Sequence, residues 1–234
     1  MTASEILKEL EALGSASYRR TLANHGVPDP CFGVKISDLK KIQKRVKKDY
    51  ELALALYDSG VYDAMYLAGL IADDERMTKK DLRKWAKKAC RPLAGYTVPS
   101  VAAGSPHAVE LAREWIASDT ELITVAGWAT FSCLVSVRPD DELDLAELRK
   151  LLRHVRKSIH QAPNYVRYEM NGFVISVGSY VTSLTELTKE VGDAIGRVSV
   201  DMGNTACQVP FAPDYIRKVE QHGSLGKKRK SAKC

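Results

Sequence analysis

The sequence predicts an all-α fold, a superhelix of stacked antiparallel helix pairs, and two observations carry this prediction. The first is a ten-residue pattern that begins at Leu39, Leu82 and Leu148. In each copy apolar residues occupy the first, fourth and eighth places, which form one helical stripe, and basic residues fill most of the others. The second is the lack of strand-like apolar–polar alternation along the 234 residues. Repetition on this scale is typical of helix pairs stacked as a solenoid.

The helices expected in the first half of the chain begin at ordinary N-terminal signals. Thr2 and Glu5 have capping-box spacing and open the first helix. Ser37 is the expected cap of the third helix, and Thr78 with Asp81 forms a second capping box. The expected ranges are 1–13, 16–25, 37–48, 50–58, 61–72, 79–91 and a weaker helix at 93–103.

Similar signals set the helices of the second half. Ser105 and Pro106 provide a cap followed by proline at the first helical position. Asp119 and Asp144 are the expected caps of the next two helices, and Pro163 opens another. The expected ranges are 106–117, 120–136, 145–160, 164–177, 181–197 and 214–221.

These helices and their short connections indicate one domain over residues 1–222. Connections of two to eight residues are what a HEAT-like or armadillo-type array requires. The glycines and prolines after the last long helix predict an irregular C-terminal cap over about 198–222. Residues 223–234 are expected to be a solvated basic tail.

Composition limits the classes of function. At 45% hydrophobic residues the chain can bury a substantial core, and its net charge of +6 is compatible with a polyanionic partner without establishing one. The five cysteines are scattered and no histidine lies near them at ligand spacing, so we expect neither a metal nor another cofactor. With no secretory leader and no apolar run of membrane-spanning length, we expect a cytoplasmic monomer without a membrane partner.

Short motifs then follow one another along the chain in a particular order. They are Gly33-Val34, Ser37-Asp38-Leu39, Leu56-Tyr57-Asp58-Ser59, Tyr66-Leu67-Ala68-Gly69-Leu70-Ile71-Ala72, Glu114-Trp115-Ile116-Ala117-Ser118-Asp119, Asn171-Gly172-Phe173 and Val200-Asp201-Met202-Gly203-Asn204-Thr205-Ala206-Cys207-Gln208-Val209-Pro210. In order and spacing they resemble the bacterial DNA alkylation repair family, the AlkD-like group of HEAT-repeat DNA glycosylases. The resemblance covers nearly the whole chain. It implies a HEAT-like superhelix whose partner is double-stranded DNA.

The resemblance also implies a chemistry, which this sequence matches only in part. The family removes cationic 3- and 7-alkylpurines, and a carboxylate between tryptophans stabilises the positive charge that develops on the sugar. Here the segment 93–103 contains neither a tryptophan nor a carboxylate. No catalytic residue can therefore be transferred, and N-glycosylase activity is in doubt. Glu169 is the one weak substitute that the resemblance places on the inner face.

The resemblance places a set of aromatic and polar residues on the inner helices, where they would contact DNA. This set is Tyr66, Tyr96, Trp128, Tyr165, Arg167, Asn171 and Phe173. Aromatic side chains can stack on a base or a sugar, and an arginine can contact a phosphate. The alternative is that each aromatic residue belongs to the core and that Arg167 forms a structural ion pair.

Basic residues outside this set are weaker candidates for phosphate contacts. They are Lys40, Lys44, Lys47, Lys227, Lys228 and Arg229. Charge runs are usually solvated faces, and the resemblance places the helices 79–91 and 145–160 on the outer side. Three functions remain open: a DNA-binding member of the family without excision activity, an active N-glycosylase, and a non-catalytic HEAT-repeat scaffold for a protein partner.

Overall fold

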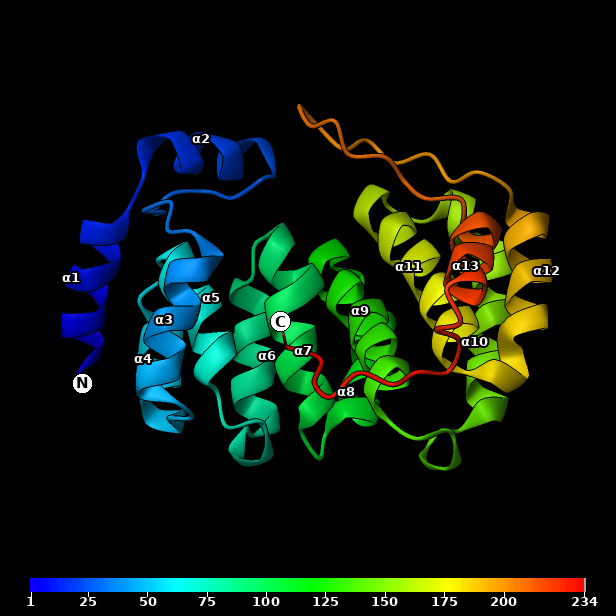
Figure 1. The fold of residues 1–234 in the computed structure, drawn as a ribbon, viewed down its shortest axis with the longest axis horizontal. Coiled ribbons are helices and arrows are strands. Elements are labelled where there is room, and N and C mark those ends of the chain that lie inside the picture. Colours follow the sequence, from blue (N-terminus) through cyan, green and yellow to red (C-terminus); the bar gives the residue numbers. More distant parts are fainter. Residues whose placement is uncertain (234) are drawn as a thin grey trace.

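The computed structural model describes residues 1–233, which contain thirteen α-helices and no strand (Figure 1). The α-helices are α1 (Ala3–Leu13), α2 (Ala16–Asn24), α3 (Ile36–Val46), α4 (Tyr50–Asp58), α5 (Tyr62–Ile71), α6 (Lys79–Lys88), α7 (Val98–Gly104), α8 (Ala108–Ile116), α9 (Glu121–Val137), α10 (Leu145–Ser158), α11 (Asn164–Tyr180), α12 (Thr185–Ile195) and α13 (Ala212–Gln221). A π-helical stretch, η2 (Leu93–Thr97), leads into α7. The all-α prediction is confirmed.

The helices form two rows. The inner row consists of α5, α7, α9 and α11, each packed against the next, while α4, α6, α8, α10 and α12 form the outer row against it. Close approach between rows depends on small residues. A Cβ on Gly127 of α9 would lie 2.6 Å from the Ile116 backbone nitrogen at the end of α8. Backbone therefore meets backbone where α8 and α9 cross.

The template helices α3, α6 and α10 bury the apolar stripe that the sequence pattern predicts. Leu39, Leu82 and Leu148, the first residues of the three copies, are all buried. The Trp85 ring of α6 stacks on the Tyr57 ring of α4, with 4.0 Å between centroids. The stripe holds each template helix against its neighbours and leaves the basic side chains outside.

Helix caps follow the sequence at some termini and depart from it at others. The capping boxes of Thr2 and Thr78 are both formed, and the Asp144 side chain caps α10. The expected caps Ser37 and Asp119 are wrong, because Lys35 and Thr120 occupy the N-cap positions of α3 and α9 without a side-chain hydrogen bond.

The prediction of a solvated C-terminal tail is wrong for part of residues 223–233: Lys227, Arg229 and Lys230 have exposed side chains, but Ala232 is buried and Lys228 and Lys233 are partly buried. Residue 234 lies outside the described residues. Residues 226–233, here named the C-terminal strap, run back across one end of the inner row (Figure 1). The Gly226 and Arg229 amides and the Lys228 and Lys233 ammonium groups donate hydrogen bonds to the carbonyl oxygens of Ser179, Ser136, Val135 and Ala72, respectively. These carbonyls end α11, α9 and α5, where the helix dipoles are negative.

Two ion pairs fix the C-terminal strap further. Lys228 Nζ lies 2.7 Å from an Asp140 carboxylate oxygen, and Lys233 Nζ lies 2.6 Å from Asp74. Burial lowers the pKa of Lys233 and raises that of Asp74, although the opposite charge of the partner counteracts both shifts. The basic side chains of Lys228 and Lys233 therefore compensate negative charge at the C-terminal ends of α9 and α5.

The irregular segment between α12 and α13, residues 196–211, is named the C-terminal loop. Its chain is held to α11 because the side-chain amides of Asn164 and Asn171 donate to the carbonyls of Asp201 and Pro210. A Cβ on Gly203 would lie 3.8 Å from the Asn24 carbonyl oxygen of α2. The C-terminal loop and α2 thus approach one another on one side of the inner row (Figure 1).

Candidate functional site

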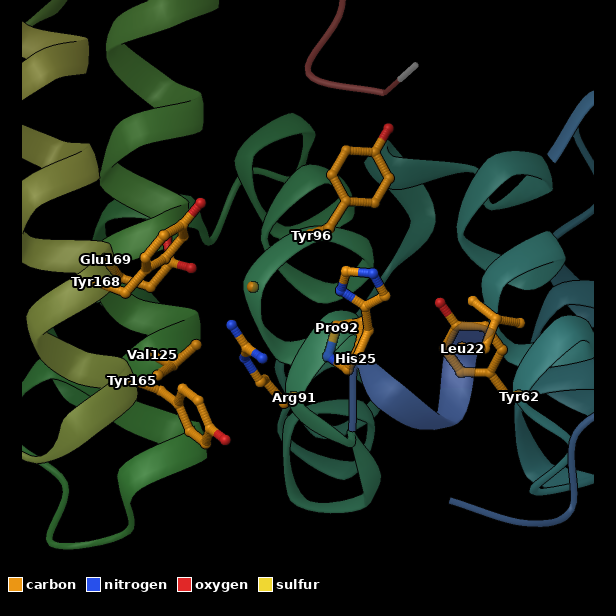
Figure 2. A pocket seen from close by; sticks show the side chains of 11 residues that line it. Leu22, His25, Tyr62, Arg91, Pro92, Tyr96, Val125, Tyr165, Tyr168 and Glu169 are labelled. Carbon is orange, nitrogen blue, oxygen red and sulfur yellow. The ribbon is translucent and has the colours of Figure 1, made fainter. Parts of the chain in front are cut away.

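A cavity of about 330 Å³ lies beneath α2, at the N-terminal ends of the inner helices (Figure 2). We name it the inner-face pocket; it is lined by Leu22, His25, Tyr62, Arg91, Pro92, Gly95, Tyr96, Val125, Tyr165, Tyr168 and Glu169. Tyr62 opens α5, Arg91 precedes η2, Val125 lies in the first half of α9 and Tyr165 is in the first turn of α11. Because helix N-termini carry partial positive charge, this end of the row favours an anion.

Arg91 is held between two parts of the chain. Its guanidinium carbon lies 4.3 Å from the centroid of the Tyr165 ring, and its Nη2 donates to the Met202 sulfur of the C-terminal loop at 3.8 Å. The Tyr165 amide is itself fixed, since it donates to the Glu121 carboxylate at 2.7 Å. Arg91 makes no ion pair within residues 1–233, so the pocket contains a positioned cation.

Arg91 points inward because of where the second template copy ends. The helix α6 stops at Lys88, three residues before the end of the pattern, and the chain then turns into η2 through Pro92. Arg91 therefore leaves the outer side, on which the family resemblance placed the helix 79–91. The sequence reasoning missed this residue, and the proline directly after it was the only available signal.

Glu169 brings a carboxyl group into the same pocket. Burial raises its pKa to about 8, although the charge of Arg91 acts in the opposite direction. Its space depends on Gly95, where a Cβ would lie 3.0 Å from Glu169 Oε1. None of the described residues donates a hydrogen bond to this carboxyl. Most of the protein at neutral pH therefore carries Glu169 in its neutral form.

Tyrosines form the remaining walls. The Tyr96 ring stacks on Tyr66 with 5.6 Å between centroids, and the Tyr62 ring lies 6.4 Å from Tyr66. Tyr168 lies beside Glu169 (Figure 2), and burial raises its pKa. The pocket thus offers aromatic faces, one cation and one neutral carboxyl to a ligand.

The structure divides the seven predicted contact residues between different places. Tyr96 and Tyr165 line the inner-face pocket, and Tyr66 is buried behind Tyr96. Trp128 and Phe173 lie in the core, where their ring centroids are 5.3 Å apart. Both were expected on the inner surface. The Trp128 ring instead points toward the outer row, where it is buried and stacks on His154 of α10.

Arg167 and Asn171 lie under the C-terminal loop. Asn171 holds the carbonyl of Pro210, as described above, and Arg167 Nη2 donates to Asn164 Oδ1 at 3.4 Å. Arg167 forms no ion pair with any described residue. Both lie outside the inner-face pocket: at about 100° per residue Arg167 is on the side of α11 opposite Tyr165, while Asn171 lies beside Tyr168 but faces the loop.

The weaker phosphate candidates are also dispersed. Lys44 and Lys47 are exposed and Lys40 is partly buried, on or directly after α3, while Lys227 and Arg229 are exposed on the C-terminal strap. Lys228 forms an ion pair with Asp140 and donates a hydrogen bond to the Val135 carbonyl at the end of α9. Sequence reasoning missed His25 and Tyr168 as pocket residues, since neither belongs to a recognisable pattern. Within residues 1–233, no helix combines the length and apolar character needed to cross a bilayer.

The sequence of this chain is similar to a family model and to two bacterial proteins. A family model described as DNA alkylation repair enzyme matches residues 6–183. An uncharacterised protein of Listeria monocytogenes is 34% identical over 93% of this chain and 97% of its own length, and one of Listeria innocua is 33% identical over the same shares.

A solved structure matches the fold closely. It has a TM-score of 0.93 and 34% sequence identity, and the match covers 100% of both chains. It is described as a new family of proteins related to the HEAT-like repeat DNA glycosylases, with affinity for branched DNA structures. The predicted HEAT-like architecture is confirmed.

Proposed function

The chain belongs to the family of DNA alkylation repair enzymes, and from this premise we propose that it binds branched DNA through the inner-face pocket. The solved relative with affinity for branched DNA supports this choice of substrate class. The choice rests on that relative's description together with the chemistry of the pocket in this chain.

The observation that carries the proposal is the position of Arg91. A guanidinium stacked on a tyrosine and unpaired with any described carboxylate is suited to a phosphate, which it can bind through two parallel hydrogen bonds. The N-terminal ends of the inner helices add positive potential around it. Because Glu169 is mostly neutral at pH 7, it does not cancel this charge.

The tyrosines suit the unpaired or distorted nucleotides that occur where DNA branches. Every base has a π-face, so stacking on Tyr96 or Tyr168 holds a base with little dependence on sequence. The cavity of about 330 Å³ is at the lower end of the usual range for ligand pockets. We propose that it takes one nucleotide at the branch and that Arg91 contacts the adjoining phosphate.

The experiment is a salt-titrated binding assay with a four-way junction and a linear duplex of equal length. Wild type is expected to prefer the junction, and Arg91→Gln to bind it about tenfold more weakly with a salt slope lower by about one. Lys80→Gln, which removes an exposed and unpaired outer lysine, is the control. If wild type binds neither DNA at low salt, the proposal is wrong and the scaffold hypothesis gains.

A second candidate function is base excision, and the carboxyl group in the pocket is the observation that favours it. Glu169 is the single carboxyl among the lining residues, and only its ionised form can stabilise a cationic sugar. Because its pKa is about 8, excision of 7-methylguanine or 3-methyladenine by this group would rise from pH 7 to pH 9. Equal release of base by wild type and Glu169→Gln, or no release by wild type, would exclude it.

A further inference from the structure

The outer face of α10 carries a row of basic side chains with no acidic partner. We name Arg149, Lys150, Arg153, Arg156 and Lys157 the α10 basic stripe; all five are exposed. At 3.6 residues per turn these spacings place them on one face of the helix, and the stripe is about 12 Å long. Within residues 1–233, none of the five forms an ion pair.

The template helix α6 shows a different state of the repeat, and α3 is intermediate, since Lys40, Lys44 and Lys47 of its pattern form no ion pair with a described residue. In α6, the same pattern places four of its six basic side chains in ion pairs with neighbouring helices. Arg83 pairs with Glu114 of α8 at 2.6 Å, while Lys84 and Lys88 share Asp58 of α4. The fourth pair joins Lys79 to Glu110, and in α3 Arg45 pairs with Glu9 of α1. These ion pairs thus join neighbouring helices to one another, and those of α6 do so along the outer row.

No such compensation is available to α10. The only acidic residue within the helix is Glu147, and Arg113 of α8 already pairs with it. Like charges one turn apart repel each other and destabilise a helix slightly. The stripe therefore keeps this repulsion without relief from a carboxylate among the described residues. Its charge is complementary to an external polyanion.

A groove runs beside the stripe, between α8 and α10. Its volume is about 560 Å³, and its floor is apolar, formed by Ile116, Phe131 and Leu151. Lys150 and Arg153 of the stripe also line it, as do the α10 cap Asp144 and the Arg113–Glu147 ion pair. Cations above an apolar floor match the two parts of a DNA strand, charged phosphates and less polar sugars.

We propose that the α10 basic stripe is a second DNA-binding surface, which holds one arm of a branched DNA whose branch lies in the inner-face pocket. This inference rests on the proposed function. The two surfaces belong to neighbouring helices: α10, which presents the stripe on the outer row, packs on α11, which supplies Tyr165, Tyr168 and Glu169 to the pocket. A linear duplex lying on the inner row has no arm to turn toward the outer row, whereas a junction has several.

The test compares two variants with equal loss of charge. Arg149→Gln/Arg153→Gln removes part of the stripe, and Lys80→Gln/Lys87→Gln removes two exposed, unpaired lysines of α6 as the matched control. Both are assayed on a four-way junction and a linear duplex over a range of salt. The stripe variant is expected to bind the junction about tenfold more weakly, with a salt slope lower by about two, and to bind the duplex within about twofold of wild type.

Two results would overturn the inference. One is a junction affinity of the stripe variant equal to that of the α6 control; the other is an equal loss on junction and duplex, which would indicate general attraction without a dedicated arm site. Thermal melts confirm that both variants fold. If wild type binds the junction and Arg91→Gln weakens it while the stripe variant does not, the proposed function stands and this inference alone fails.

Discussion

Glu169 is the residue whose environment most constrains the chemistry of the site. A carboxyl with a pKa near 8 binds a proton in the folded protein over a pH range in which the unfolded chain, with a value near 4.5, has lost it. Stability therefore falls as pH rises from about 4.5 to about 8, because the folded state must give up a favoured proton. Below that range the group is neutral in both states.

We predict that Glu169→Gln stabilises the fold in a pH-dependent way. The amide is never charged, so the variant is expected to match wild type near pH 5 and to exceed its free energy of unfolding by a few kcal/mol at pH 9. Urea unfolding at pH 5, 7 and 9 measures the difference, and Glu190→Gln, at an exposed position on α12, is the control. A difference between wild type and Glu169→Gln that is constant across pH would contradict the raised pKa.

At this scale the sequence predicted some residues of the site and not others. Tyr96, Tyr165 and Glu169 could be selected because the family resemblance located their helices. Trp128 and Phe173 could not be told from site residues, since an inner helix that is buried on both sides carries apolar residues on every face. Arg91 was missed because its inward direction depends on where α6 ends. The helix ends at Lys88, three residues before the expected end at residue 91.

At the scale of the helix, order and type were predictable and close approach was not. Every expected helix is present, because amphipathic stripes and capping boxes are local signals. The contact of Gly127 with Ile116 is a property of two helices together. A glycine within an apolar run gives no sign of which neighbour approaches it.

We predict that Gly127→Ala destabilises the protein by about 1–3 kcal/mol, because the new methyl group would meet backbone atoms that cannot move aside. Gly172→Ala, in the middle of α11, is the matched control: its Cβ would have no neighbour nearer than 3.9 Å. Alanine's higher helix propensity should leave that variant unchanged or up to about 1 kcal/mol more stable. Denaturant midpoints measure both, and a Gly127→Ala midpoint as high as the control's would refute the close contact.

At the scale of the whole molecule, the C-terminal strap joins parts of the array that the repeat pattern leaves separate. Its contacts run from the end of α11 past α9 to the end of α5. The sequence showed the basic run but not its destination, because the negative ends of the inner helices come together only in the folded array. A basic terminus in isolation is more often solvated.

We predict that Lys233→Met lowers the free energy of unfolding by about 1–3 kcal/mol, because it leaves the Asp74 carboxylate buried without its partner. The double variant Asp74→Asn/Lys233→Met should lose less free energy of unfolding than the sum of the losses in the two single variants. Lys230→Met, which alters an exposed lysine of the strap, serves as the control. Additive effects in this double-mutant cycle would show that the pair is not coupled.

The strap also bears on how the protein is made. Lys233 contacts a carbonyl that precedes it by 161 positions, whereas a repeat array otherwise gains its contacts from neighbouring units as they are synthesised. Early helices can therefore pair as they leave the ribosome, but the Ala72, Val135 and Ser136 carbonyls lack these protein donors until residues 226–233 follow. Completion of the inner row is thus coupled to synthesis of the strap.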